Sequence, residues 1–301
     1  MIKPLLNKYN PINTNTMKLE GRRESTNVED RRGMSGGAIA GGIGGGALLI
    51  ALIVMLLGGD PTSVLQQAGT GTATGQNTEV TFTQEEQELA SFAKKILAGT
   101  EDVWTAQFAK YGYEYQAPKM VLYTGVTSSG CGTANSQVGP FYCSADQTVY
   151  IDLSFFATMK QQIGADGDLA YAYVIAHEVG HHVQNLLGTL GKAHQIMQRS
   201  SKTVSNQYSV RLELQADYYA GVWANNDNAR YRSLEAGDIE KALNCAAKIG
   251  DDYLQKKSQG YVVSESFTHG TAQQRYNWLK RGMTYGDIEH GDTFSPDYNK
   301  L

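Results

Sequence analysis

The sequence predicts an α+β fold, mainly helical with a small sheet, behind a single apolar N-terminal segment. Three observations predict it. Residues 33–59 carry no charged side chain, several later stretches place apolar residues at helical spacing, and three short runs are rich in β-branched and aromatic residues. The 301 residues include 41% hydrophobic residues, enough to bury a core in water. Their formal charge of −4 provides no basic field, so nucleic acid is not an expected partner.

Residues 34–59 are typical of a transmembrane helix. Every residue at positions 38–57 is Ala, Gly, Ile, Leu, Val or Met, and about 20 apolar residues suffice to cross roughly 30 Å of hydrocarbon. We therefore expect one helix that anchors the chain in a lipid bilayer. A cleaved signal peptide is the alternative, but the sequence Gly-Gly-Asp-Pro follows the apolar run where a small-residue cleavage site would be needed.

The charges beside this segment predict its orientation. Basic residues precede it, whereas no lysine or arginine follows it until Lys94. The positive-inside rule then places residues 1–33 in the cytoplasm as a basic segment, and the body in the periplasm or outside the cell of a bacterium. The start of the chain is open between Met1 and Met17.

A glycine stripe inside the apolar segment suggests self-association. Gly37, Gly41 and Gly45 recur at every fourth position, which would let a second copy of the helix approach closely and form a homo-oligomer. The alternative is that glycine is simply common in anchors that cross the membrane once.

The remaining chain divides into a linker and a folded body. Residues 60–79 are rich in Gly, Thr and Gln without an apolar face, which favours a flexible linker. The folded body is expected over 80–301. Within it, apolar spacing over 84–112 predicts two short helices that break near Gly99. Strands are expected at 119–123, 140–143 and 148–155.

The three cysteines divide into a pair and a single residue. Cys131 and Cys143 are twelve positions apart and lie on the side of the membrane where disulfides persist, so we expect a bridge between them. Two buried thiols are the alternative. Cys245 falls in a helix-like stretch and is interpreted as a small core residue.

Residues 166–188 form one helical pattern that contains the sequence His-Glu-x-x-His. His177 and His181 are four positions apart, so both imidazoles lie on one helix face and can bind one metal ion. Glu178 is rotated by about 100° from His177 and can face a water on that metal without being a ligand. His182 points about 100° away from His181, toward a supporting role or the surface. A surface helix with two histidines is the alternative.

A catalytic zinc ion needs a third protein ligand, which we expect from a second helix over 207–224. Glu213 and Asp217 are four positions apart on this helix. Glu213 is expected to bind the metal, and Asp217 to accept the outward N–H of a ligand histidine, which fixes the tautomer and direction of the ring. In the alternative, the two acids pair with Arg211 or face water.

Further motifs extend over nearly the whole chain from Met17, at residues 27–33, 139–143, 149–153, 176–184, 213–223 and 266–271. Together they resemble the bacterial neutral zinc metallopeptidase family often called YpfJ-like, within the gluzincin group that pairs HExxH with a downstream ExxxD. The resemblance implies a zincin-like domain over 80–301, in which an edge strand lies beside the metal helix, a glutamate helix lies below it, and a cleft separates them. It also implies one Zn²⁺ ion and hydrolysis of peptide bonds.

The expected mechanism follows from the charges of these residues. Zinc lowers the pKa of its bound water toward about 7. Glu178 removes the proton as general base and returns it to the leaving amine. His269 is the candidate donor of a hydrogen bond to the oxyanion. Its segment also has the features of a helix start, because Thr268 and Thr271 precede a helical pattern.

The sequence therefore predicts a membrane-anchored zinc endopeptidase that acts on peptide or protein substrates. Residues 150–153 are expected to pair with an extended peptide as an added strand. The alternative is a membrane protein that keeps the zinc fold for binding or a chaperone-like role, without turnover. Purely structural zinc is disfavoured, because such sites use four protein ligands and more cysteines than this region contains.

Overall fold

The computed structural model describes residues 17–33, 81–135 and 139–301. Its helices are α3 (Gln84–Lys110), α4 (Ser154–Thr158), α5 (Asp168–Leu186), α6 (Thr189–Arg199), α7 (Lys202–Tyr231), α8 (Asp238–Lys248), α9 (Asp251–Gln259) and α10 (Ala272–Tyr285). A π-helical turn spans Met159–Ile163, and 3₁₀ turns span Ser264–Ser266, Glu289–Gly291 and Tyr298–Lys300. The strands are β1 (Val28–Asp30), β2 (Lys119–Tyr123), β3 (Val126–Ser129), β4 (Gly132–Asn135), β5 (Phe141–Cys143) and β6 (Thr148–Asp152). The expected α+β class, mainly helical with a small sheet, is confirmed.

The sheet has the order β1-β2-β6-β5. β1, β2 and β6 run parallel, and β5 pairs antiparallel with β6, with Tyr142 opposite Val149. β6 is buried at every position and lies between two strands, so it cannot accept a further strand. The prediction that residues 150–153 pair with an extended peptide as an added strand is therefore wrong, and β5 is the strand at this edge of the sheet. β3 and β4 form a separate antiparallel pair.

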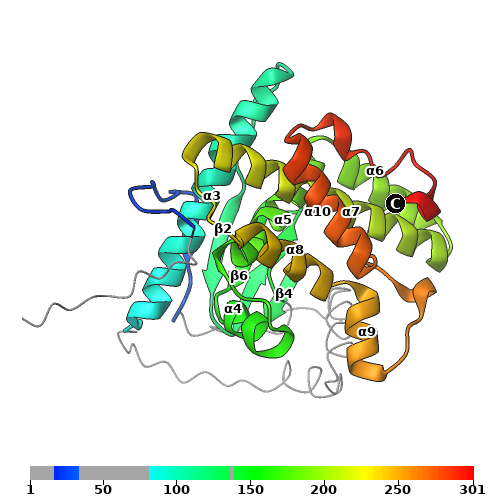
Figure 1. Cartoon of the computed structure of the whole chain (residues 1–301), viewed down its shortest axis with the longest axis horizontal. Helices are drawn as coiled ribbons and strands as arrows, with labels where there is room; N and C mark the ends of the chain where they lie inside the picture. The colour runs from blue at the N-terminus through cyan, green and yellow to red at the C-terminus, as the bar shows by residue number, and fades with distance from the viewer. Residues whose placement is uncertain (1–16, 34–80, 136–138) are drawn as a thin grey trace, which may run out of the picture.

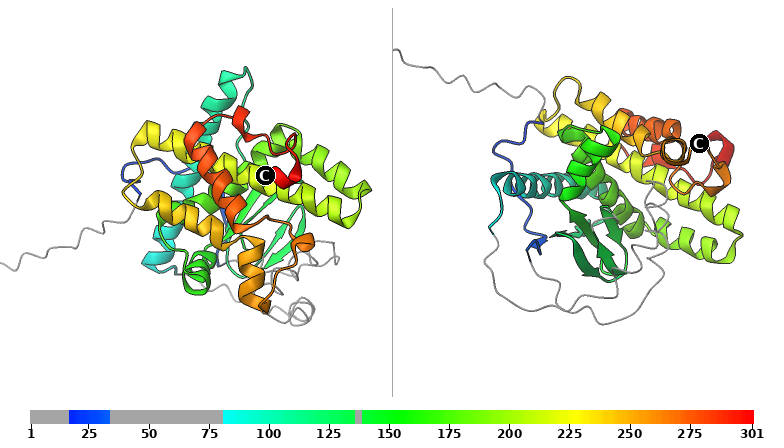
Figure 2. Two further views of the ribbon diagram at one scale, coloured as in Figure 1. Left: turned by 45° about the vertical axis from the view of Figure 1, so that its right-hand side comes forward. Right: turned by 90° about the horizontal axis from the view of Figure 1, so that it is seen from below.

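The helices pack together over the sheet, with α3 at one side of the molecule and the C-terminal helices at the other (Figures 1 and 2). α3 is one helix of 27 residues, whereas the sequence predicted two. Its expected break, Gly99, lies inside the helix, where a Cβ atom would stand 2.7 Å from the guanidinium of Arg22 and 2.9 Å from Asp227. This glycine therefore makes room for a close ion pair and does not end the helix.

Residues 17–33, which the sequence analysis placed apart from the body in the cytoplasm, pack on the body. β1 pairs with β2 along its whole length, and Met17 and Leu19 lie in the main hydrophobic core. Arg22 donates to both carboxylate oxygens of Asp227, at 2.5 and 3.0 Å, and the Asp227 side chain is wholly buried. The fold therefore includes residues 17–33 and does not begin at residue 80.

A second acidic residue of the body also depends on this segment. Glu101, on α3, is buried and accepts hydrogen bonds from the Ser25 hydroxyl at 2.5 Å and the Asn27 amide at 2.8 Å. Arg23 donates to the other oxygen of Glu101 at 2.9 Å. The basic and polar side chains of residues 17–33 thus satisfy buried carboxylates of the body.

The expectations for residues 34–59 and 60–79, which include the membrane anchor, the glycine stripe and the flexible linker, lie outside the described residues. None of the helices in the described part of the chain combines the length and apolar character that a bilayer crossing requires.

The predicted bridge between Cys131 and Cys143 is present. It ties the β3–β4 turn to the end of β5, the strand nearest the metal helix. Cys245 is free and buried in the core, as expected, and burial raises the pKa of its thiol to about 12.

Replacing Cys131 and Cys143 together by serine is expected to lower the free energy of unfolding by about 3 kcal/mol, because the bridge restricts the unfolded chain. Urea denaturation of the full chain measures this change. Reductant should lower the midpoint of the wild type by the same amount and leave the double variant unaffected. Equal midpoints for the wild type and the double variant would contradict a stabilising bridge.

Candidate metal centre

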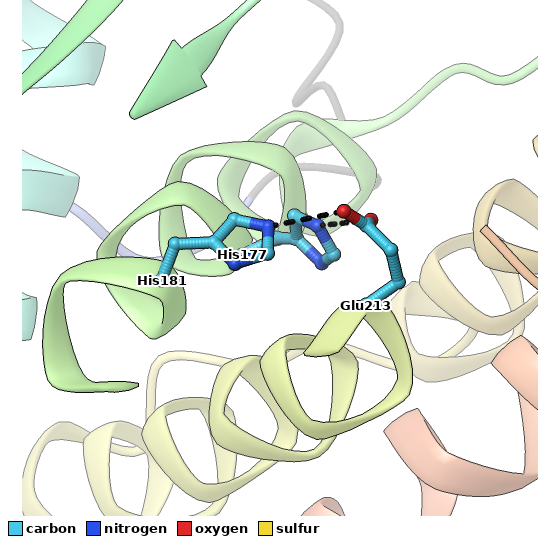
Figure 3. A group of neighbouring side chains, drawn as sticks. All are labelled: His177, His181 and Glu213. Atoms are coloured by element: carbon cyan, nitrogen blue, oxygen red, sulfur yellow. Dashed lines mark hydrogen bonds and ion pairs between the residues drawn. The ribbon is translucent and has the colours of Figure 1, made fainter. Parts of the chain in front are cut away.

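His177 and His181 lie one turn apart on α5, and their ring centroids are 4.8 Å apart. Glu213, on α7, points at both rings (Figure 3). One Glu213 oxygen lies 3.2 Å from Nε2 of His177, and the other lies 3.4 Å from Nε2 of His181. The potential ligand atoms of the three residues all lie within 4.8 Å of one another. The structure thus brings together the three residues that the sequence predicted as metal ligands.

A close helix contact positions the third member of this group. Gly180 lies between the two histidines in the sequence, and a Cβ atom there would stand 2.9 Å from the carbonyl oxygen of Ala216 on α7. Only glycine lets the two backbones approach this closely. Because Glu213 lies about one turn before Ala216, the contact places its carboxylate beside the imidazoles.

The donor set fits zinc. Two imidazole nitrogens and one carboxylate oxygen, with one position left for water, are a common ligand set of catalytic zinc sites. Burial lowers the pKa of His177, but Asp217 and Glu213 outweigh burial and raise it to about 10. Burial acts to raise the pKa of Glu213, yet His181 and His177 hold it well below its usual range. The carboxylate therefore stays ionised and can bind a cation together with the two imidazoles.

Glu178 is not one of the three potential metal ligands. It lines the same cavity of about 540 Å³ as His177, His181 and Glu213. Burial raises the pKa of its carboxyl group, whereas His177, His181 and the backbone N–H of Tyr142 act to lower it. A buried carboxylate with a raised pKa is a better proton acceptor than an ordinary exposed one.

Asp217 is fully buried, and its Oδ1 lies 2.8 Å from Nδ1 of His177. An ionised carboxylate only accepts hydrogen bonds, so Nδ1 carries the hydrogen and Nε2 is directed at the metal centre. This is the predicted role of Asp217. The alternative that the acids pair with Arg211 is wrong, because Arg211 donates to the carbonyl oxygens of Thr293 and Pro296.

His269 lies on a loop that borders the cavity. The backbone N–H groups of Thr268, His269 and Gly270 all donate to one oxygen of Asp251, and the other oxygen lies 3.1 Å from Nδ1 of His269. Burial lowers the pKa of His269, but Asp251 and Glu213 outweigh it and raise the pKa. The helix start expected nearby is also present, since Thr271 caps α10 with a capping box.

Several residues of the centre were missed in the sequence analysis or given no definite role. Asp251, Tyr173 and Arg275 belong to no metal-binding motif. Tyr173 and Arg275 line the cavity, and Asp251, on α9, contacts the cavity residue His269. His182 is fully buried, with Nε2 2.6 Å from the carbonyl oxygen of Gln116 and Nδ1 3.0 Å from the Tyr142 hydroxyl. The only sequence signal for His182 was its position next to His181. Through its contact with Tyr142, His182 holds β5 against α5.

Replacing Glu213 by alanine is expected to abolish stoichiometric zinc binding, because it removes one of three protein ligands. Replacing Asp217 by asparagine is expected to weaken zinc binding by about 10–100-fold, because it disturbs only the partner of a ligand. Zinc content after dialysis against a graded chelator measures both changes. Full zinc occupancy in Glu213→Ala would exclude Glu213 as a ligand.

Comparison of the sequence with known proteins assigns the chain to a family. The profile of the family described as "Putative neutral zinc metallopeptidase" matches residues 17–294. The protein YpfJ of Escherichia coli strain K12 is 52% identical over 284 residues, which cover 92% of this chain and 99% of the relative. The protein Rv2575 of Mycobacterium tuberculosis strain H37Rv is 39% identical over 253 residues, which cover 80% of this chain and 85% of the relative. No solved structure matches the chain. The chain therefore belongs to the neutral zinc metallopeptidase family, and its cofactor is zinc.

Proposed function

We propose that this protein is a zinc-dependent endopeptidase in which Glu178 is the general base. One observation carries the proposal: His177, His181 and Glu213 converge in a cavity that also contains the carboxylate of Glu178. A purely structural zinc site would close the ion with a fourth protein ligand. Among the described residues, no fourth ligand joins this group, and the carboxylate of Glu178 lines the same cavity.

The residues of the cavity divide the reaction between them. Zinc, when bound by His177, His181 and Glu213, supplies a Lewis acid that polarises the scissile carbonyl and acidifies water. Glu178 accepts a proton from the attacking water and gives it to the leaving amine as the C–N bond breaks. His269 donates a hydrogen bond from Nε2 to the oxyanion, while its Nδ1 is hydrogen-bonded to Asp251.

The surroundings of the centre suit an extended peptide. β5 is the terminal strand of its sheet in the described part of the chain, and it leads directly to the cavity through Phe141 and Tyr142. A peptide can add to such an edge through backbone hydrogen bonds. The cavity walls are largely apolar, with Phe155, Met159 and Leu212 among them. Family membership already implies a peptide or protein substrate, and these features favour cleavage within a chain.

The location of the body is part of the proposal. A disulfide persists in oxidising compartments, so the bridge between Cys131 and Cys143 supports a body outside the cytoplasm. Contact with a lipid bilayer through residues 34–59 is also proposed, on the composition of that segment alone and without a crossing that would separate residues 17–33 from the body.

Turnover of a defined peptide library by the full chain in detergent tests the proposed activity. We expect internal cleavage that stops after treatment with a zinc chelator and returns when zinc is added. Zinc binding without cleavage of any library member would overturn the peptidase proposal and favour the binding or chaperone-like alternative.

A further inference from the structure

The carboxylate of Asp217 lies at the centre of a buried polar cluster behind the metal centre. Its Oδ1 accepts hydrogen bonds from the Tyr173 hydroxyl at 2.6 Å and from Nδ1 of His177 at 2.8 Å. Arg275 donates from Nη2 to Oδ1 at 2.9 Å and from Nε to Oδ2 at 2.8 Å. All four side chains are buried, and Arg275 is only 3% exposed. Asp217 thus has a full set of donors.

Arg275 supplies the charge that this cluster needs. A buried carboxylate needs hydrogen-bonded partners, and Arg275 provides two of the four hydrogen bonds that Asp217 accepts. The planar guanidinium of arginine is always charged, and it donates two parallel hydrogen bonds to a carboxylate. Arg275 therefore fixes the plane of the Asp217 carboxylate, and with it the acceptor that faces Nδ1 of His177.

The helix that carries Arg275 is held in place by a very close crossing. α10 meets α7 where a side chain at Gly282 would collide with the carbonyl oxygen of Tyr218, and Gly221 lies against the same contact. Gly221 follows Asp217 by about one turn, and Gly282 follows Arg275 by about two turns. The crossing thus aligns the helix faces that carry Arg275 and Asp217.

We propose that Arg275 is a positioning residue, which acts through Asp217 to aim Nε2 of His177 at the zinc ion. The proposal rests on the proposed function, since it assigns a role within the same centre. Arg275 lies on α10, a helix that provides none of the predicted zinc ligands.

Zinc affinity of the full chain, measured by competition with a chromophoric chelator, tests the role of Arg275. Arg275→Lys keeps the positive charge but removes the pair of parallel hydrogen bonds to Asp217. We expect zinc to bind about 10–100-fold more weakly, and kcat to fall at saturating zinc while KM is unchanged. Arg211→Lys is the matched control, because Arg211 is a buried arginine of α7 that donates to backbone carbonyl oxygens away from the centre. It should bind zinc like the wild type.

A double variant keeps the test decisive if Arg275→Lys does not fold. Asp217→Asn combined with Arg275→Gln leaves no unpaired charge in the cluster. If Arg275 acts through Asp217, this pair should bind zinc as Asp217→Asn does alone, and a further tenfold loss would overturn the proposal. Wild-type affinity in a folded Arg275→Lys would also overturn it. A wild type that binds no zinc would instead overturn the proposed function.

A second and independent inference concerns the compartment of residues 17–33. β1 pairs with β2 at three positions, and the backbone N–H of Met17 donates to Asp168 at 3.1 Å. Arg32 lies 4.2 Å from the centre of the Phe82 ring and donates to the carbonyl oxygen of Glu86 at 2.7 Å. The described residues on both sides of 34–80 therefore contact each other.

We infer that residues 17–33 and the body occupy the same compartment. A cytoplasmic basic segment with an outer body, as expected from the flanking charges, would place about 30 Å of hydrocarbon between β1 and β2. It would also remove Arg22 from Asp227, whose side chain is wholly buried. The bilayer arrangement that the positive-inside rule favours cannot coexist with these contacts.

Labelling of single added cysteines in the full chain, expressed in intact cells, tests this inference. Glu20→Cys reports on the segment and Glu114→Cys on the body, since both positions are exposed. The native cysteines are bridged or buried, so the unaltered chain is the control. A membrane-impermeant maleimide should label both variants or neither. Labelling of only one variant in intact cells, with both labelled after permeabilisation, would overturn the inference.

Discussion

A chain that begins at residue 80 is expected not to fold. It lacks the arginine that neutralises Asp227, and removing one partner of a buried ion pair destabilises a protein by about 3–5 kcal/mol. It also lacks the hydrogen-bond donors of Glu101 and the burial of Met17 and Leu19. These losses together are comparable with the whole stability of a domain, roughly 5–15 kcal/mol. Circular dichroism and thermal unfolding of the shortened chain measure the effect.

The matched control restores only residues 17–33. Joining them to residue 81 through a short glycine-serine linker should recover a cooperative transition, because Arg32 and Phe82 are already in contact. Arg22→Met in the joined chain should again lower stability, since it leaves Asp227 unpaired. A chain from residue 80 that unfolds at the temperature of the joined chain would show that residues 17–33 are dispensable.

The variant Glu178→Gln is expected to lose peptide turnover while it retains zinc. The amide has nearly the shape of the carboxylate but cannot accept a proton, so kcat should fall by about 10²–10⁴-fold. Zinc content should equal that of the wild type, because Glu178 is not one of the three ligands. Steady-state kinetics and metal analysis of the same preparation separate the two effects.

Glu114→Gln is the matched control for this variant, since it makes the same change at an exposed position of the body. It should leave both turnover and zinc content unchanged. Turnover of Glu178→Gln within a few fold of the wild type would exclude Glu178 as the base. Loss of zinc together with turnover would show that Glu178 contributes to binding the ion.

The ligands could be predicted because their arrangement is local. Helix geometry alone places His177 and His181 on one face, and the same spacing marks Glu213 and Asp217 on the next long helix. Nothing local marks Arg275 or Asp251, because each acts on a residue that is far away in the sequence. Their roles depend on how α9 and α10 pack.

The errors of the sequence analysis share a physical cause. Gly99 has low helix propensity, but the close approach of Arg22 and Asp227 outweighs it in the folded chain. The strand at 148–152 alternates apolar and polar residues, yet β5 covers one edge across a short turn and β2 covers the other through long-range pairing. Arg22 and Arg23 are among the basic residues whose position before the apolar segment predicts a cytoplasmic N-terminus, whereas their partners are buried carboxylates on α7 and α3. A sequence does not show which acid a given arginine will meet.

X-ray absorption spectroscopy at the zinc edge, on the full chain loaded with zinc, tests the central claim most directly. The account predicts one zinc ion per chain, bound by two imidazole nitrogens and by oxygen atoms from Glu213 and solvent. In Glu213→Ala this ligand shell should be lost. A shell that contains sulfur or more than two imidazoles, or an identical shell in Glu213→Ala, would contradict it.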